Sequence, residues 1–307
     1  MINVALIFPG QGAQKVGMGK EFHDSSSEAR AVFKEAEGIL QNGLTKVIFE
    51  GPAEKLTSTA FCQPGILTFS FAALKAFQSH PKFQNIKPQF TTGLSLGEYS
   101  ALVASGALKF SDALRLVERR SFFMEEATKI IPGTMAAIIG FPRQRLKEIC
   151  AQIGAEVANY NSPEQIVITG HRAKVEEACR LIKEEGAKSV IPLDVSGAFH
   201  STLMQPASQK FETELEKILI QSCSIPVISN VDSLPENSAS QIRQNLSKQI
   251  VSSVRWEESI QYMADHGIMD FIEIGPGKVL KGLIRRINPA LRVFNIERPE
   301  DINTLPF

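Results

Sequence analysis

The apolar run at residues 4–8, Val-Ala-Leu-Ile-Phe, limits the possible folds more strongly than any other segment. Five consecutive apolar residues leave neither face of a strand polar, which is typical of a parallel sheet covered by helices on both sides. Further elements alternate after this run: helices at 27–40, 63–77 (opened by Pro64), 97–108 and 111–128 (with Ser111 as N-cap), and a short strand at 90–92. The first part of the chain therefore predicts an α/β domain with a parallel sheet.

The pattern of elements changes near Pro132. Candidate elements then follow in the order strand, helix, strand, strand, helix, strand, at 134–139, 143–151, 157–159, 165–169, 172–185 and 187–193. This β-α-β-β-α-β order is typical of a ferredoxin-like unit. We therefore expect a ferredoxin-like subdomain at residues 130–198, inserted into a large α/β domain made of residues 1–129 and 199–307. The second part of that domain is predicted to hold helices at 204–219, 239–250 and 256–266, strands at 226–229 and 270–274, and a final helix after residues 275–277.

Composition excludes several classes of protein. The 307 residues are 43% hydrophobic and 21% charged, which is ordinary for a folded chain able to bury a core without disulfides or metals. Lys and Arg number 33, as do Asp and Glu, so no overall charge favours nucleic acid or an anionic membrane. The 4 Cys form no CxxC pair and have no His at zinc-ligand spacing, which predicts free thiols and no metal site. With neither a signal peptide nor a membrane-spanning run in sight, we expect a cytoplasmic monomer.

The strongest chemical motif is the segment 93–97, Gly-Leu-Ser-Leu-Gly, between a candidate strand and a candidate helix. It matches G-x-S-x-G, in which a sharp turn projects the hydroxyl, here that of Ser95, outward and the helix N-terminus favours a developing oxyanion. A second glycine-rich turn, residues 8–12, closes the first strand, and the backbone N–H of Gln11 is a candidate second oxyanion donor. This turn lacks the third glycine of a dinucleotide motif and the Gly-Lys-Ser/Thr of a P-loop.

A serine nucleophile needs a base, and a nearby cation would indicate the substrate. Of the 5 His, only His200 lies in an apolar, glycine-containing segment at the predicted domain junction. Arg119 and Arg120 follow the serine motif on the next predicted helix. A guanidinium beside the nucleophile would suit a substrate carboxylate, and helical phase alone does not choose between the two arginines.

Several motifs together resemble the malonyl-CoA:acyl carrier protein transacylases of type II fatty acid synthesis. They are the segment 8–12, Gln63-Pro64, the segment 93–99, Arg120 with Met124, the segments 157–163 and 197–201, Gln249 ahead of 254–256, and Gly-Pro-Gly at 275–277. The resemblance covers essentially the whole chain. It implies an α/β-hydrolase-like large domain with the inserted ferredoxin-like unit.

The resemblance also implies a ping-pong reaction and a role for each matching residue. Ser95 would take the malonyl group as an ester, and His200 would be the general base and acid, oriented by the main-chain carbonyl of Gln249. Arg120 would bind the malonyl carboxylate. The remaining matches are the oxyanion donors Gln11 and Leu96, the cleft residues Gln63 and Asn161, and Phe199, whose ring would disfavour an α-methyl branch. The implied partners are malonyl-CoA and acyl carrier protein, and the only prosthetic group is the phosphopantetheine that they carry.

One residue departs from the family pattern, and three other functions stay open. Leu94 replaces the usual His before the nucleophile, which removes a polar group beside Ser95.

A thioester hydrolase would use the same Ser95 and His200, although Arg120 argues against it. A transacylase of a polyketide synthase would differ only in its carrier, and a non-catalytic relative would keep the fold alone. For an acidic carrier, the expected basic docking surface is Lys278, Lys281, Arg285 and Arg286.

Overall fold

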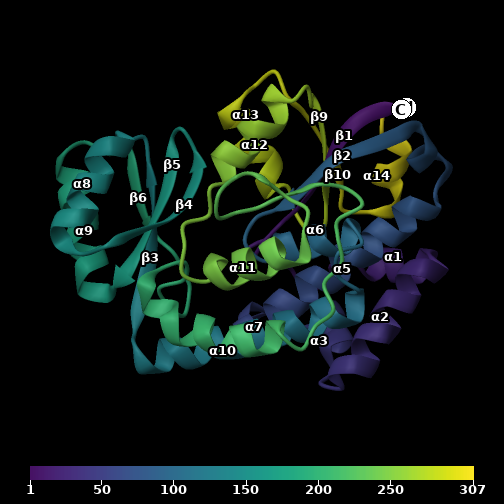
Figure 1. The fold of residues 1–307 in the computed structure, drawn as a ribbon, viewed down its shortest axis with the longest axis horizontal. Helices are drawn as coiled ribbons and strands as arrows, with labels where there is room; N and C mark the ends of the chain where they lie inside the picture. The colour runs from purple at the N-terminus through teal and green to yellow at the C-terminus, as the bar shows by residue number, and fades with distance from the viewer.

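Two β-sheets organise the chain in the computed structural model, which describes all 307 residues (Figure 1). The larger sheet has six strands in the order β10-β9-β1-β2-β7-β8. Its strands are β1 (Ile2–Phe8), β2 (Ile86–Gly93), β7 (Val227–Ile228), β8 (Pro235–Glu236), β9 (Asp270–Ile274) and β10 (Arg292–Ile296). All neighbours are parallel except β7 and β8, which are antiparallel. The predicted α/β domain with a parallel sheet is therefore confirmed.

Strand β1 lies in the middle of this sheet and is covered on both faces. Val4, Leu6 and Phe8 join one hydrophobic cluster with residues of α2 (Ser27–Leu40), α5 (Thr59–Ser79), α6 (Gly97–Ala104) and α7 (Phe110–Ile130). Ala5 and Ile7 join a second cluster with residues of α12 (Trp256–Asp265) and α13 (Val279–Ile287). Alternate residues of a strand face opposite sides, so the apolar run at 4–8 is explained by helices on both faces.

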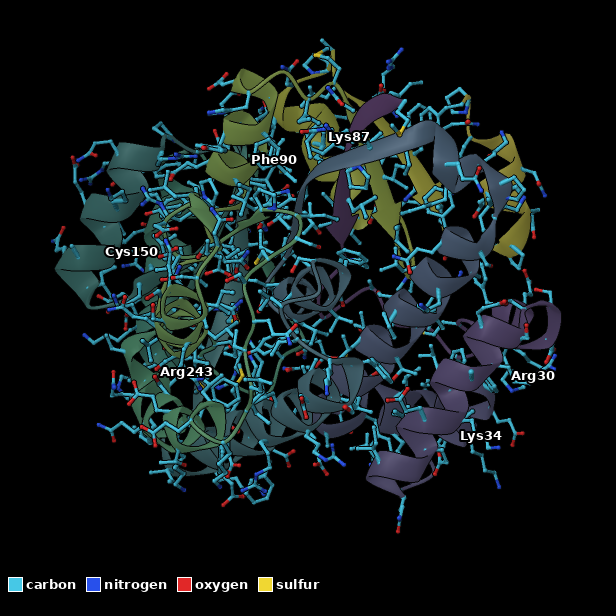
Figure 2. The ribbon with its side chains drawn as sticks, turned by 45° about the vertical axis from the view of Figure 1, so that its right-hand side comes forward. Arg30, Lys34, Lys87, Phe90, Cys150 and Arg243 are labelled. Carbon is cyan, nitrogen blue, oxygen red and sulfur yellow. The ribbon has the colours of Figure 1, made fainter.

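The larger part of the molecule holds six further helices. They are α1 (Lys20–Ser25), α3 (Leu44–Glu50), α4 (Ala53–Thr57), α10 (Gln205–Leu215), α11 (Ala239–Gln249) and α14 (Pro299–Thr304), with 3₁₀ turns at Pro81–Asn85 and Thr202–Met204. Helix α2 shows how a helix at the surface packs on the core. Its Val32 and Phe33 are buried, while Arg30 and Lys34 point outward (Figure 2).

Helix α5 is the one helix long and apolar enough to suit a membrane span. Within the fold, however, 78% of that apolar stretch is buried. It packs in the same hydrophobic cluster as α2 and α7. Its composition is therefore that of a core helix surrounded by protein.

The smaller sheet, in teal at the left of Figure 1, is antiparallel and has the order β4-β5-β3-β6. Its elements are β3 (Gly133–Ile139), α8 (Arg143–Ile153), β4 (Glu156–Ser162), β5 (Gln165–His171), α9 (Arg172–Glu184) and β6 (Ser189–Pro192). This is the β-α-β-β-α-β order predicted from the sequence. The two helices pack on one face of the sheet through apolar side chains such as Leu146, Ile168 and Ile182.

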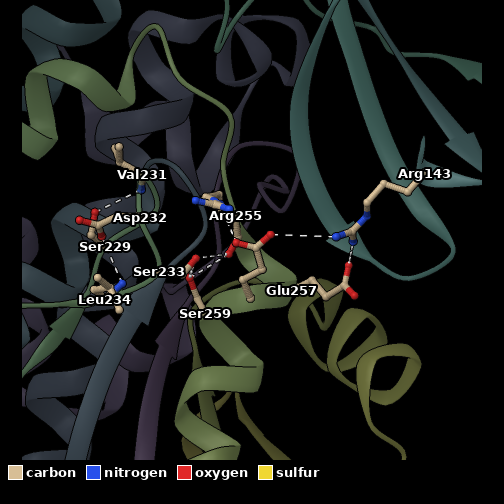
Figure 3. A network of polar contacts seen from close by, with 10 residues as sticks. Arg143, Ser229, Val231, Asp232, Ser233, Leu234, Arg255, Glu257 and Ser259 are labelled. Carbon is tan, nitrogen blue, oxygen red and sulfur yellow. Dashed lines mark hydrogen bonds and ion pairs between the residues drawn. The ribbon is translucent and has the colours of Figure 1, made fainter. Parts of the chain in front are cut away.

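The smaller sheet is tied to the larger part of the molecule by polar contacts. Arg143, at the start of α8, forms an ion pair with Glu257 of α12, and nearby hydroxyls of Ser233 and Ser259 donate to the carbonyl of Arg255 (Figure 3). The Tyr160 N–H on β4 also donates to the Val254 carbonyl at 2.9 Å. These contacts hold β4 and α8 against α12 and the segment that precedes it.

Three expectations about the helices are wrong, and the helices expected at 97–108 and 204–219 end earlier, at Ala104 and Leu215. Pro64 lies inside α5 and does not open it, because the helix begins five residues earlier at Thr59. The missing N–H of Pro64 leaves one helical hydrogen bond unmade in the second turn. Ser111 is not an N-cap, since α7 begins at Phe110 after an extended Lys109.

The third error concerns the end of the chain. Helix α13 is not the final element, because β10 and α14 follow it. Strand β10 was not predicted because it is an edge strand in which two polar residues interrupt the apolar pattern. Arg292 pairs with Asp270 and Asn295 donates to Glu273, both on the neighbouring β9.

Candidate active site

Ser95 stands on a tight turn between β2 and α6, as the G-x-S-x-G motif predicts. Its φ is +53°, in the left-handed region that side chains other than glycine rarely adopt. The flanking glycines are required by close packing. A Cβ on Gly97 would lie 2.1 Å from the Phe8 carbonyl oxygen, and one on Gly93 would lie 2.0 Å from the backbone of Gly97. The turn is therefore pressed against the end of β1, and the hydroxyl projects from it.

His200 meets Ser95 although 105 residues separate them. The Ser95 Oγ lies 2.7 Å from His200 Nε2, and His200 Nδ1 lies 2.8 Å from the main-chain carbonyl oxygen of Gln249. A carbonyl can only accept, so Nδ1 carries the hydrogen and Nε2 is the free basic nitrogen. Asp194, in contrast, is exposed and does not bind the ring.

The environment of His200 keeps the imidazole neutral. Burial lowers the pKa of His200 to about 4, and the positive charge of Arg120 acts in the same direction. The hydrogen bond to Gln249 opposes this shift without cancelling it. At neutral pH the ring is therefore an unprotonated base within hydrogen-bonding distance of a hydroxyl.

Arg120 is the arginine that reaches the site. Its side chain is 1% exposed, and its Nη1 donates to Gln63 Oε1 at 2.7 Å. Its Nη2 donates to Ser95 Oγ at 3.0 Å and to Gln249 Oε1 at 3.1 Å. All of these acceptors are neutral, and Arg120 forms no ion pair with any Asp or Glu.

Arg119 points away from the site. It forms an ion pair with Glu214 at 3.7 Å and its guanidinium lies over the rings of Phe122 and Phe123. The two neighbours on α7 therefore differ completely in environment, which the helical phase of the sequence did not distinguish.

Two backbone N–H groups border the serine and have no partner within the protein. Those of Gln11 and Leu96 donate to no backbone or side-chain acceptor. Their loops touch, because a Cβ on Gly10 would lie 2.3 Å from the Leu94 carbonyl oxygen. Unpaired N–H groups at the carboxyl ends of two adjacent parallel strands are suited to hold an oxyanion.

These groups open into a cleft of about 190 Å³. Every other cleft residue expected from the sequence except Gln249 lines it: Gln11, Gln63, Leu96, Asn161 and Phe199. Gln249 lies behind the serine, 1% exposed, and acts through its contacts with His200 and Arg120. Much of the rest of the wall is apolar and includes Leu94, whose side chain packs against the cluster formed with α12 and α13. No group of three or more His, Cys, Asp or Glu side chains is placed to hold a metal ion.

Two polar residues of the site were not predicted from the sequence. Asn230 follows β7, accepts from the Ser95 N–H at 2.6 Å and donates to the Gly93 carbonyl at 2.8 Å. Glu98, in the first turn of α6, accepts from the Gln249 side chain at 2.5 Å. The position of Asn230 at the carboxyl end of a predicted strand was the available signal, since ligand sites gather there.

Comparison with known proteins decides the family. Residues 5–291 match the model of the acyl transferase domain. The chain is 46% identical over 307 residues to the malonyl CoA-acyl carrier protein transacylase of Bacillus subtilis (strain 168), covering 98% of this chain and 96% of the relative. The chain belongs to the acyl transferase family, among the malonyl CoA-acyl carrier protein transacylases. The resemblance predicted from the sequence motifs is thus confirmed.

Solved structures of this transacylase family share the fold. The acyl-carrier-protein-S-malonyltransferase from Bartonella henselae is 37% identical, with a TM-score of 0.94 over 99% of this chain and 98% of that chain. A malonyl-transacylase in complex with a type II PKS acyl-carrier protein is 36% identical, with the same TM-score and the same coverage.

Proposed function

We propose that this protein transfers the malonyl group from malonyl-CoA to the phosphopantetheine thiol of acyl carrier protein, and so supplies fatty acid synthesis. The observation that carries the proposal is the buried guanidinium of Arg120, which has no carboxylate partner and touches the Ser95 hydroxyl. A buried cation without a protein anion is favourable only if a ligand supplies one. An acyl group that ends in a carboxylate meets that requirement.

The first half-reaction forms an ester on Ser95. The Oγ attacks the thioester carbonyl carbon while His200 Nε2 takes the hydroxyl proton, as the 2.7 Å contact allows. The N–H groups of Gln11 and Leu96 hold the resulting oxyanion. The carbon–sulfur bond then breaks, and the CoA sulfur leaves with the proton from His200.

The second half-reaction reverses these steps with another thiol. His200 takes the proton of the carrier's phosphopantetheine thiol, and the sulfur attacks the malonyl-serine ester. The serine oxygen leaves as the hydroxyl with the proton from His200. Every step of this scheme uses protein groups and the substrates alone. The phosphopantetheine is part of CoA and of the carrier, and so arrives with each substrate.

The other cleft residues select and orient the acyl group. Arg120 binds the malonyl carboxylate in a two-pronged geometry, with Gln63 fixing one side of the guanidinium. Phe199 crowds the site of an α-methyl branch, and Asn161 lines the same cleft. Because one methyl group changes discrimination by about 1–3 kcal/mol, we expect a preference for malonyl and not an absolute exclusion.

The partners and setting follow from the same reasoning. The relatives are named as transacylases of malonyl CoA and acyl carrier protein, and one structural neighbour is a complex with a carrier protein. We propose a cytoplasmic monomer. Arg120 disfavours the alternative of a hydrolase for uncharged acyl chains, which has no use for a buried guanidinium.

We also propose that residues 130–198 form a subdomain inserted between residues 1–129 and 199–307. The support is the separate antiparallel sheet with its own cluster of apolar residues from α8 and α9. The first and last strands of the segment, β3 and β6, are hydrogen-bonded neighbours, so the chain enters and leaves nearby. The catalytic cleft then lies where the two units meet.

Intact-mass measurement after mixing with malonyl-CoA tests the function. The wild-type protein should gain one malonyl group, and acyl carrier protein should discharge it onto the carrier thiol. Ser95→Ala should gain none. Steady release of CoA into water, with neither a stable adduct nor a loaded carrier, would instead show a hydrolase and overturn the proposal.

A further inference from the structure

A buried carboxyl group lies beneath the reacting residues. Glu98 is completely buried in the first turn of α6. Its Oε2 accepts from Gln249 Nε2 at 2.5 Å and from the Asn230 backbone N–H at 3.3 Å. Its Oε1 has no hydrogen-bond partner. The reaction scheme above gives this side chain no part.

The two residues that Glu98 holds are the ones that fix the reacting groups. The Gln249 side chain donates to the Ser95 carbonyl at 2.9 Å and accepts from Arg120, while its main-chain carbonyl holds His200. Asn230 fixes the other side of the serine turn. Base, nucleophile and arginine therefore all depend on neighbours of one carboxyl.

Charges around Glu98 favour its neutral form. Burial raises the pKa of Glu98 well above its ordinary value, and the charge of Glu236, a completely buried residue on β8, raises it further. Arg120 on α7 and the two N–H donors oppose this shift. Burial also raises the pKa of Glu236 to about 7, with Asp232 adding to the effect. Two buried carboxyls close together do not readily both ionise, so the pair retains a proton at neutral pH.

We propose that Glu98 is a positioning residue: its carboxyl, as the neutral acid, holds Gln249 and Asn230, and Glu236 keeps it in that form. The proton lies on Oε1, which accepts no hydrogen bond, and it is shared with the carboxyl of Glu236, whose Oε1 has no other partner. This inference rests on the proposed transacylase function and gives a role to the hydrogen bonds that Glu98 forms behind the reacting residues.

Neutrality of Glu98 has a direct consequence for the substrate. An ionised Glu98 would be a buried counter-charge for Arg120 and would weaken its attraction for the malonyl carboxylate. The neutral acid still accepts the hydrogen bond from Gln249 through Oε2 and leaves the arginine charge for the substrate. Glu98 thus acts on substrate binding through charge and on turnover through position.

Four variants separate these two effects: Glu98→Ala, Glu98→Gln, Glu236→Gln and the double variant Glu98→Gln/Glu236→Gln. Each is assayed for kcat and KM with malonyl-CoA from pH 6 to 9, after its thermal unfolding shows a folded protein. Glu98→Ala removes one of the two acceptors of the Gln249 amide and leaves the Ser95 carbonyl as the other. The reacting groups should then be misplaced, and kcat should fall by about 100-fold. Glu98→Gln keeps a neutral acceptor and should retain kcat within about three-fold.

Glu236→Gln tests the protonation state. Glu236 accepts a hydrogen bond from the Asn245 side chain, shares a side-chain hydrogen bond with Glu98, and touches no reacting group. Without its charge, Glu98 ionises more readily, so KM for malonyl-CoA should rise with pH by about 10-fold. The double variant cannot ionise at either position, so its KM should show no such rise. A merely structural role for Glu236 would give a pH-independent effect that Glu98→Gln does not rescue.

Three results would overturn the inference. They are wild-type kinetics in a folded Glu98→Ala, a loss in Glu98→Gln as large as that in Glu98→Ala, and a KM in Glu236→Gln that does not change with pH. Wild-type protein that forms no malonyl adduct would instead refute the proposed function. The two failures are therefore distinguishable.

Discussion

Replacing Arg120 with Ala should change which acyl groups the protein accepts more than how fast it reacts. The guanidinium is 1% exposed, and its three hydrogen bonds go to neutral oxygens. Binding of a malonyl carboxylate would therefore create a buried ion pair. Removing one partner of such a pair typically costs about 3–5 kcal/mol, because the other charge is left unpaired.

At about 1.4 kcal/mol for each tenfold change, this corresponds to a loss of about 100- to 4,000-fold in kcat/KM for malonyl-CoA. Acetyl-CoA has no carboxylate to pair. It should lose only the effect of the 3.0 Å hydrogen bond between the charged Arg120 and Ser95, which is worth about 1.5–3 kcal/mol or about 10- to 100-fold and is lost for malonyl-CoA as well.

The assay measures acyl transfer from malonyl-CoA and acetyl-CoA to the carrier, with Arg119→Ala as the matched control. Arg119 is the adjacent arginine on the same helix, but it pairs with Glu214 outside the cleft, so its removal should affect neither substrate. Equal losses for malonyl-CoA and acetyl-CoA in Arg120→Ala would refute the reasoning, since they would show that the arginine supports Ser95 and does not bind the carboxylate.

Three further predictions concern pH, packing and docking. Burial and Arg120 lower the pKa of His200 to about 4, so kcat/KM should be constant above pH 5 and fall only near pH 4. A fall centred at pH 6.5 would contradict the assignment of His200 as the buried base. The same shift means that the unfolded chain binds more protons between pH 6.5 and 4, so the free energy of unfolding should decrease as pH falls through that range. Gly97→Ala should lower the free energy of unfolding by about 1–3 kcal/mol, since its Cβ would collide with a backbone carbonyl of β1. The control Gly282→Ala places its Cβ in open space on α13 and should not destabilise the protein. Equal denaturation midpoints for the two variants would disprove the packing argument. Reversing the charges of Arg285 and Arg286, both exposed on α13, should raise KM for acyl carrier protein and not for malonyl-CoA, and equal changes in both values would exclude a carrier-docking role.

The parts of the fold that could be predicted from sequence are those encoded locally. The apolar run at 4–8 indicated a doubly covered strand because alternate residues each needed an apolar partner. The glycines at 93 and 97 indicated a tight turn because a larger side chain has no room there. Strand β10 was missed because Arg292 and Asn295 interrupt its apolar pattern for the sake of partners on β9.

The site was predictable only in part, for the same reason. The family resemblance indicated Ser95, His200 and the Gln249 carbonyl, and the structure places them in contact. Glu98 lies within the matching segment 93–99 and Asn230 follows a predicted strand, but neither position indicates which residues it contacts. The hydrogen bonds by which they act join residues more than 130 positions apart, so their roles become visible only when the chain is folded.

The backbone is strained at both reacting residues, which lowers stability where activity requires it. Ser95 and His200 are two of only four non-glycine residues with positive φ, at +53° and +57°. Each such conformation typically costs about 1 kcal/mol or more, and surrounding packing must maintain it. Glycine would adopt either conformation without that strain. The hydroxyl and the imidazole can therefore be placed against each other only on a strained backbone, so part of the folding free energy is given up to bring the two reacting atoms together.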